Sequence, residues 1–263
     1  MTAGGPRPAA RREVDLDDVT DAGAPGALGS EPSPPWAHVP AALARLQLEL
    51  PVGAPVRCSA RDGQPPGVPP VTELVAGAGF VVESARRVTG RWLVDARRDR
   101  SLPDFAGPGM RMLVCGLNPS LVAADAGYGY AGATNRFWSV ALAAGIVTHP
   151  RDPLSALAED GLGMTDLVKR ATPNADDLTP AEYQEGAARV ARLVEWLRPG
   201  VVLFVGLAGW RAAIDRRAQP GPQPSPFGGM PAYVMPSTSG RNARTTPAEL
   251  AAHMRRALAL APP

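Results

Sequence analysis

Arg111–Trp138, RMLVCGLNPSLVAADAGYGYAGATNRFW, is the stretch of the chain that decides its fold. It begins with a short apolar run, Met112 to Cys115, which is closed by glycine and is typical of a buried strand. A loop without helical or strand periodicity follows, and an apolar helical pattern begins at Asn135–Trp138. A strand that leads through a loop into a helix places the loop at the carboxyl edge of a sheet, where open α/β folds have their sites. Asn118, at the exit of this strand, is therefore the first candidate site residue.

Strand and helix patterns alternate along the rest of the chain. The strongest helix signal is a capping box at Thr179 and Glu182 with proline between them, and a second box opens at Thr246. Further helices are expected at residues 135–144, 153–159, 180–197, 208–217 and 246–260, and further strands at 201–205 and 232–235. This alternation predicts an α/β fold in three layers, α/β/α, with a mostly parallel central sheet.

The first 70 residues have a different composition. They contain 13 Pro and 8 Gly, and this content predicts a disordered N-terminal tail over 1–70. Ala41 to Leu50 carries a weak helical pattern within it. The folded domain is expected at 71–263, with its motif-bearing core at about 102–263. An arginine-rich run at 86–100 reads first as a solvated face, and the alternative is a contact with phosphates.

Composition excludes several classes of protein. The net charge is only +2, and no apolar run reaches the length of a membrane span or of a signal-peptide core. The two cysteines, Cys58 and Cys115, cannot ligate a four-cysteine iron–sulfur cluster, and they fit a reducing cytoplasm without a disulfide. The histidines His38, His149 and His253 lack metal-ligand spacing. We therefore expect no metal and no cofactor.

Three ordered motifs carry a family resemblance. The first combines Gly116–Pro119, Gly127–Tyr130 and Asn135–Trp138; the second is Gly163–Arg170; the third is Met235–Asn242. Together they resemble the mismatch-specific uracil/thymine DNA glycosylases of the uracil-DNA glycosylase superfamily. The resemblance implies a monofunctional N-glycosylase of base-excision repair, which hydrolyses the bond to uracil, and by extension thymine or ethenocytosine, flipped from double-stranded DNA. It also implies a monomer at the bacterial nucleoid in the cytoplasm.

The same resemblance assigns catalytic roles. Asn118 matches the asparagine that positions the attacking water, and Thr172 matches the threonine that shares this water. Asp166 stands where some relatives have an asparagine that contacts the pyrimidine, so a carboxylate here either accepts a hydrogen bond from the base or faces the sugar cation. The alternatives are a turn cap for Asn118 and an ordinary surface acid for Asp166.

The resemblance also implies which residues bind the flipped base and which loop contacts DNA. Tyr130 matches the aromatic residue that stacks on the flipped base, with Tyr128 as a second candidate, and backbone N–H groups near Leu117 and Tyr128 are candidates for holding the base oxygen. Arg241 matches the arginine that enters the stack in thymine-processing relatives, where bacterial relatives often have leucine. The loop that carries it is expected to contact DNA through Ser237, Thr238, Ser239, Gly240, Arg241 and Asn242. The alternatives are loop anchors for the tyrosines and a polar turn for the loop.

Two other functions keep the same fold. One is a catalytically weak protein that binds mismatches or lesions, and the other is an α/β hydrolase that acts on free nucleosides. Activity on a duplex compared with free deoxyuridine separates the second from the glycosylase, and substitution of Asn118 separates the first.

Overall fold

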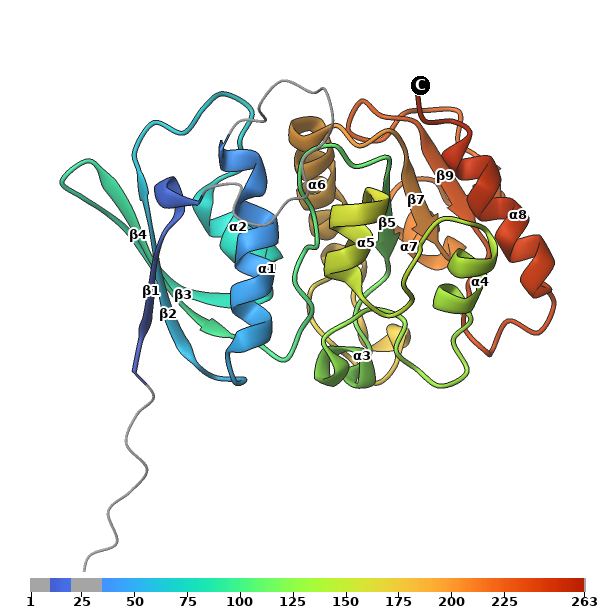
Figure 1. Cartoon of the computed structure of the whole chain (residues 1–263), viewed down its shortest axis with the longest axis horizontal. Helices are drawn as coiled ribbons and strands as arrows, with labels where there is room; N and C mark the ends of the chain where they lie inside the picture. Colours follow the sequence, from blue (N-terminus) through green and yellow to red (C-terminus); the bar gives the residue numbers. More distant parts are fainter. Residues whose placement is uncertain (1–9, 20–34, 263) are drawn as a thin grey trace, which may run out of the picture.

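A computed structural model describes residues 10–19 and 35–262 of the chain. These residues form two α/β units that lie side by side (Figure 1). Each unit has its own sheet; the N-terminal unit has one hydrophobic cluster, and the C-terminal unit has one on each face of its sheet. Residues 12–98 supply the first sheet, and residues 112–235 supply the second.

The N-terminal unit is a four-stranded sheet with two helices packed on one face. Its elements are β1 (Arg12–Asp15), α1 (Val39–Glu49), β2 (Pro55–Arg61), α2 (Val71–Gly77), β3 (Phe80–Val88) and β4 (Arg91–Arg98). The strand order is β1-β2-β4-β3, and only the β1–β2 pair is parallel. Strand β2 alternates in burial: Val56, Cys58 and Ala60 are buried, while the residues between them are partly exposed. The inward residues pack on helices α1 and α2 to form a small core.

The expectation of a disordered tail over 1–70 is wrong for the residues that the structure describes there; residues 1–9 and 20–34 lie outside the described residues. Helix α1 and strand β2 both fall within this range, and β2 pairs in register with β4. A boundary at residue 70 would therefore cut through a sheet. Proline and glycine content misleads here because the described proline and glycine residues of this range lie mostly at helix starts and in turns. They leave the alternating strand intact.

The C-terminal unit contains the five-stranded central sheet. Its strands are β5 (Met112–Gly116), β6 (Leu162–Asp166), β7 (Val202–Val205), β8 (Gly221–Pro222) and β9 (Ala232–Met235), in the order β6-β5-β7-β9-β8. All neighbouring pairs are parallel except β8–β9. Its helices are α3 (Leu121–Ala126), α4 (Phe137–Ala143), α5 (Pro153–Asp160), α6 (Pro180–Leu197), α7 (Leu207–Ala213) and α8 (Pro247–Leu258).

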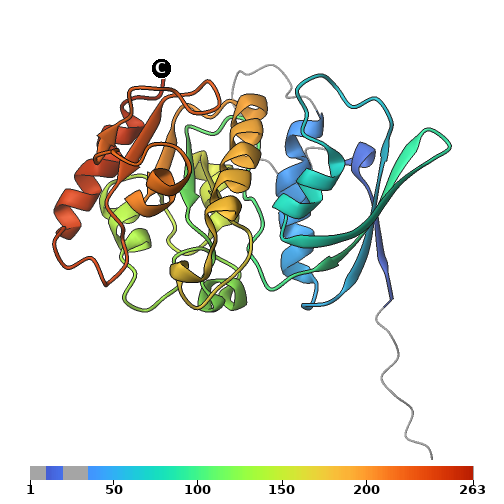
Figure 2. The same ribbon diagram turned by 180° about the vertical axis from the view of Figure 1, so that it is seen from behind.

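Helices cover both faces of this sheet, which confirms the predicted three-layer fold (Figures 1 and 2). Successive residues of a strand point to opposite faces, so Met112 and Val114 pack on the α4 and α8 side, while Leu113 and Cys115 pack on the α6 and α7 side. β5 is the first strand of this sheet along the chain. The next strand, β6, lies on one side of β5, and the following strand, β7, lies on the other side. The carboxyl ends of β5 and β7 therefore form the topological switch point, where open α/β sheets bind their ligands.

Candidate active site at the carboxyl edge of the central sheet

Two parallel segments build the site, and each continues beyond the end of a strand. The N–H groups of Leu167 and Val168 donate to the carbonyls of Gly116 and Leu117, and the N–H of Thr172 donates to the carbonyl of Pro119. The β5–β6 ladder thus extends into the two loops and places residues 116–120 alongside residues 166–172. This pairing brings together predicted site residues that are about 50 positions apart in the sequence.

Asn118 and Thr172 are directly hydrogen-bonded. Asn118 Nδ2 donates to Thr172 Oγ1 at 2.8 Å, and the same nitrogen lies 3.0 Å from the carbonyl oxygen of Arg170 and 3.2 Å from that of Pro119. Thr172 is buried, and its hydroxyl donates to the carbonyl of Asn174 at 2.7 Å. None of the described hydrogen bonds uses Asn118 Oδ1. The amide is therefore fixed through its nitrogen, and its oxygen remains as an acceptor.

Asp166 and Tyr130 meet above Gly116. A Cβ on Gly116 would collide with Asp166 Oδ1 and would lie 3.2 Å from Tyr130 Oη, so this position requires glycine. The Tyr130 hydroxyl is buried and has no hydrogen-bond partner among the described residues. The Asp166 carboxyl likewise makes no described hydrogen bond; its backbone carbonyl accepts from Arg189 at 2.7 Å and from the Thr165 hydroxyl at 3.4 Å. Two polar groups without partners therefore lie side by side at the end of β5.

The protonation of both groups follows from their surroundings. Burial raises the pKa of Asp166 to about 6, because it disfavours the charged carboxylate; Lys169 lowers the pKa, and Asp104 raises it. Burial also raises the pKa of Tyr130 well above its usual value, and the negative charge of Asp166 adds to this. Near neutral pH, Tyr130 is therefore a phenol that can donate, and Asp166, with a pKa of about 6, is mostly a carboxylate that becomes a neutral acid below that pH.

The two predicted base-binding tyrosines are held by aromatic neighbours. The Tyr130 ring stacks on Phe137 with 4.1 Å between ring centroids and 14° between ring planes, and its backbone has a positive φ of 61°. Tyr128 packs edge-on against Trp138, whose indole N–H donates to the carbonyl of Gly129 at 2.8 Å. Phe137 and Trp138 are buried core residues. They form a rigid base for the loop that carries both tyrosines.

The loop after β9 is closed by hydrogen bonds of its own. Asn242 Nδ2 donates to the carbonyl of Ser237 at 2.7 Å, and the Arg136 guanidinium donates to the carbonyls of Asn242 and Thr245. The loop leaves Arg241 exposed at the surface. It is therefore a rigid platform for one arginine side chain.

The placement of two loop residues does not favour the DNA contacts expected of them. Thr238 is 1% exposed, and its hydroxyl donates to Asn135 Oδ1 at 2.9 Å, so it faces the protein and not solvent. Gly240 packs so closely on Thr134 that a Cβ would lie 2.6 Å from Thr134 Cβ. Glycine at this position is explained by packing within the protein. Ser237 and Ser239 are half-buried and fix the turn through hydrogen bonds to backbone N–H groups.

Comparison with known families agrees with this geometry. A family model described as the uracil DNA glycosylase superfamily matches residues 103–259, which is more than half of the chain and spans the three motifs. The chain belongs to the uracil DNA glycosylase superfamily. The superfamily acts on DNA and removes uracil in base-excision repair, so the chain is a DNA glycosylase of the hydrolase class.

A cavity of about 540 Å³ opens beside the glycosylase site, at the carboxyl ends of β5, β7 and β9. Leu117, Leu167, Phe204 and Trp210 form its apolar part, and Ser237, Ser239, Arg241 and Asn242 line it from the loop after β9. Its apolar residues belong to the α6 and α7 side of the sheet, whereas Tyr130 packs on the α4 and α8 side. The cavity therefore lies across the Gly116–Leu117 backbone from Tyr130.

A charged cluster beneath the glycosylase site escaped the sequence analysis. Asp104, which is 4% exposed, accepts hydrogen bonds from Thr165 Oγ1 at 2.6 Å, Lys169 Nζ at 2.9 Å and Arg189 Nη1 at 2.5 Å. Burial acts to raise the pKa of Asp104, but the two cations and the hydrogen bonds outweigh it and lower the pKa. Lys169 is the single lysine of the chain, and this was the one feature of the sequence that pointed to the cluster.

Two further observations concern the described part of the glycosylase. Among residues 10–19 and 35–262, no group of three His, Cys, Asp or Glu side chains is placed to hold a metal ion. No helix within these residues is long and apolar enough to cross a membrane.

Proposed function

We propose that this glycosylase is the mismatch-specific, monofunctional type, which hydrolyses the N-glycosidic bond of uracil flipped out of double-stranded DNA. The observation that carries the proposal is the Asn118–Thr172 pair. Three acceptors hold the Asn118 amide by its nitrogen, so its oxygen is left to accept a hydrogen bond from one water molecule. The proposal includes a single chain acting in the cytoplasm without a metal or a cofactor.

In the proposed reaction, water attacks C1′ of the deoxyribose as the bond from C1′ to the base nitrogen breaks. The bonding electrons leave with the base as an anion, which solvent protonates; the water oxygen becomes the new hydroxyl on C1′, and its second proton passes to solvent. An amide orients water but is a poor base, so catalysis relies on positioning and on an oxocarbenium-like transition state, as in glycoside hydrolysis generally. We therefore expect slow turnover.

The base would stack on the loop that carries Tyr130 and Tyr128, with its polar edge toward Asp166. Stacking on an aromatic side chain contributes roughly 1–3 kcal/mol per base. As a neutral acid, Asp166 offers one donor and one acceptor, which match the O4 and N3–H of uracil; as a carboxylate, it offers only acceptors. The N–H groups of the Leu117 and Tyr128 backbone are proposed to face the O2 of the base.

The position of Arg241 is a second observation in favour of a mismatch-specific enzyme. A glycosylase must fill the gap that a flipped nucleotide leaves in the stack, and an inserted side chain offsets part of the unstacking cost. Arg241 is exposed on a loop whose own hydrogen bonds hold it in shape. We propose that it enters the duplex, with Ser237 and Ser239 anchoring the turn beneath it.

The proposal is tested with duplexes that differ in one base pair. Single-turnover excision would be measured on G·U, A·U, G·T and G·ethenocytosine duplexes and on single-stranded uracil, by strand scission after alkali. We expect G·U to be processed faster than A·U, because a mismatched base costs less to flip. Equal rates on G·U, A·U and single strands would overturn mismatch specificity and leave a general uracil glycosylase.

One observation favours a second candidate, a hydrolase for free nucleosides. The cavity of about 540 Å³ falls in the size range of small-molecule sites. Asn118 and Thr172 do not line it, however, so a nucleoside bound there would not meet the proposed water. Release of uracil from deoxyuridine at a rate comparable with that from the duplex would favour this candidate.

A further inference from the structure

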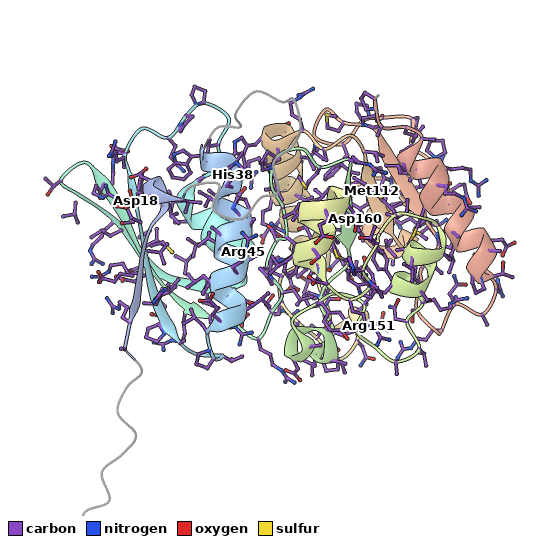
Figure 3. All side chains as sticks on the ribbon, in the orientation of Figure 1. Asp18, His38, Arg45, Met112, Arg151 and Asp160 are labelled. Carbon is purple, nitrogen blue, oxygen red and sulfur yellow. The ribbon has the colours of Figure 1, made fainter. Side chains whose placement is uncertain are left out.

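A short strap, residues 99–105, connects the N-terminal unit to the family-matched region and touches both segments of the active site. The match to the superfamily begins at residue 103, so the N-terminal unit lies outside it. Side chains nevertheless fill the space between the two units (Figure 3). Trp196 on α6 packs against the hydrophobic clusters of both units, and Glu73 on α2 pairs with Arg192 on α6 at 2.6 Å.

The N-terminal unit holds the strap at three points. The N–H of Asp99 donates to the carbonyl of Gly79, and the N–H of Asp104 donates to the carbonyl of Gly77. Gln47 on α1 is fully buried, and its Nε2 donates to the carbonyl of Ser101 at 2.8 Å. Asp104 packs directly on Gly77, where a Cβ would strike Asp104 and lie 3.1 Å from Arg189 Nη1. The strap is therefore fixed to the unit that precedes it.

On its other side, the strap reaches helix α3 and the start of the loop that follows it, residues 127–136, which carries Tyr128 and Tyr130 and is here named the tyrosine loop. The Arg100 guanidinium donates to both oxygens of Asp125, at 2.7 and 2.6 Å. Leu102 Cδ1 lies 3.9 Å from the point where a Cβ on Gly129 would stand. From α1, Leu48 Cδ2 lies 3.0 Å from the corresponding point on Gly127, and Leu48 packs against the same cluster as Tyr128 and Tyr130. These contacts hold both ends of the segment 125–129, immediately before Tyr130.

The strap also reaches the second segment of the site. The Ser101 hydroxyl donates to the carbonyl of Lys169, one residue before the carbonyl that accepts from Asn118. Asp104 binds the side chains of Lys169 and Thr165, which flank Asp166. A backbone bridge between Phe105 and Met164 ties the strap to β6. The strap is thus bonded to α3, packed against the tyrosine loop through Leu102, and bonded to the segment 166–172.

We propose that the strap and the N-terminal unit behind it are a positioning element of the active site, which sets the tyrosine loop and the segment 166–172 at the correct separation for the flipped base. The unit supplies no reacting group. Its role is to restrict two loops that belong to different strands. This inference rests on the proposed function, because it assumes that the base binds between these segments.

The test compares two arginines that make the same kind of contact. Arg100 and Arg192 each form a paired hydrogen bond with a carboxylate across the boundary between the units, and their side chains are 45% and 48% exposed. Only Arg100 bonds to α3, the helix that leads directly into the tyrosine loop. Hydrogen exchange of the full-length protein without DNA would be measured for wild type, Arg100→Ala and Arg192→Ala. We expect faster exchange over residues 121–132 in Arg100→Ala alone.

Activity adds a second readout. Exposed ion pairs contribute modestly, so single-turnover excision of G·U should fall about three- to fivefold in Arg100→Ala and remain unchanged in Arg192→Ala. Leu48→Ala, which removes an apolar contact at the same loop, should lower the rate about tenfold. The charge reversal Arg100→Asp with Asp125→Arg should recover most of the loss.

The outcomes separate the two proposals. Unchanged exchange over 121–132 in both Arg100→Ala and Leu48→Ala, or equally faster exchange in Arg100→Ala and Arg192→Ala, would overturn the positioning role. If wild type excises nothing while the selective change in exchange is present, the proposed function fails and the mechanical coupling stands.

Discussion

Replacing Asp166 by asparagine should make the protein more stable, and the gain should depend on pH. Burial raises the pKa of this carboxyl from 3.8 to about 6. The folded state therefore holds a proton that the unfolded state releases, and the cost of ionising the buried group grows as pH rises from about 4 to 6. One pKa unit corresponds to 1.36 kcal/mol, so the full cost above pH 6 is about 3 kcal/mol. Asparagine does not titrate and avoids this cost.

The assay is urea unfolding of wild type and Asp166→Asn at pH 4.5 and at pH 7.5. We expect the variant to gain about 1–3 kcal/mol relative to wild type between the two pH values, with most of the gain accumulating below pH 6 and little change above it. Glu249→Gln is the control, because the hydrogen bond from the Thr246 N–H lowers the pKa of that carboxyl, so its loss should destabilise the protein at neutral pH. A difference between wild type and Asp166→Asn that is the same at both pH values would refute the reasoning.

Two further changes test other parts of the structure. Arg241→Ala should slow excision from duplexes far more than from single strands, because only a duplex has a stack to hold open; equal slowing on both, with a lower salt dependence, would indicate a phosphate contact instead. Deletion of residues 1–70 should abolish cooperative unfolding or solubility, because it removes α1 and the strand β2 that pairs with both β1 and β4; a truncated protein that keeps the wild-type melting temperature would contradict the folded N-terminal unit.

Local sequence signals predicted the C-terminal unit well where they were strong. Helix α6 begins and ends at the predicted residues, Pro180 and Leu197, and its capping box at Thr179 and Glu182 is formed. Strand β9 also has its predicted bounds. Both rest on information within the segment itself: a cap with a long apolar stripe in one case, and a continuous apolar run in the other.

Elements that depend on their neighbours were missed. Strand β6, LGMTD, has only a short apolar content, and it is a strand because it pairs in parallel with β5. Helix α3 was expected to be loop; it is a single short helix, capped by Ser120. The alternation of β2, with Val56, Cys58 and Ala60 buried, was present in the sequence and was outweighed by the proline and glycine count of residues 1–70.

The residues of the candidate site also fall into those that the sequence predicted and those that depend on distant neighbours. The motifs predicted which residues would gather at the sheet edge, and the structure brings Asn118 to Thr172 and Tyr130 to Asp166. Thr238 was expected at the DNA surface and instead faces Asn135, because a motif does not show which side chains of a turn point inward. Asp104 could not be found from sequence, since its partners Lys169 and Arg189 are 65 and 85 residues away.

The central claim is that a water molecule held by Asn118 attacks the sugar. The most direct measurement is single-turnover release of uracil from a G·U duplex by wild type and by Asn118→Ala, with duplex binding measured in parallel. We predict that wild type releases uracil and that the variant loses about 100-fold or more in rate, since an oriented catalytic group usually contributes at least that much. Duplex binding should persist, because the loop that carries Arg241 is unchanged. A variant that binds the duplex and retains more than about a tenth of the wild-type rate would contradict the account.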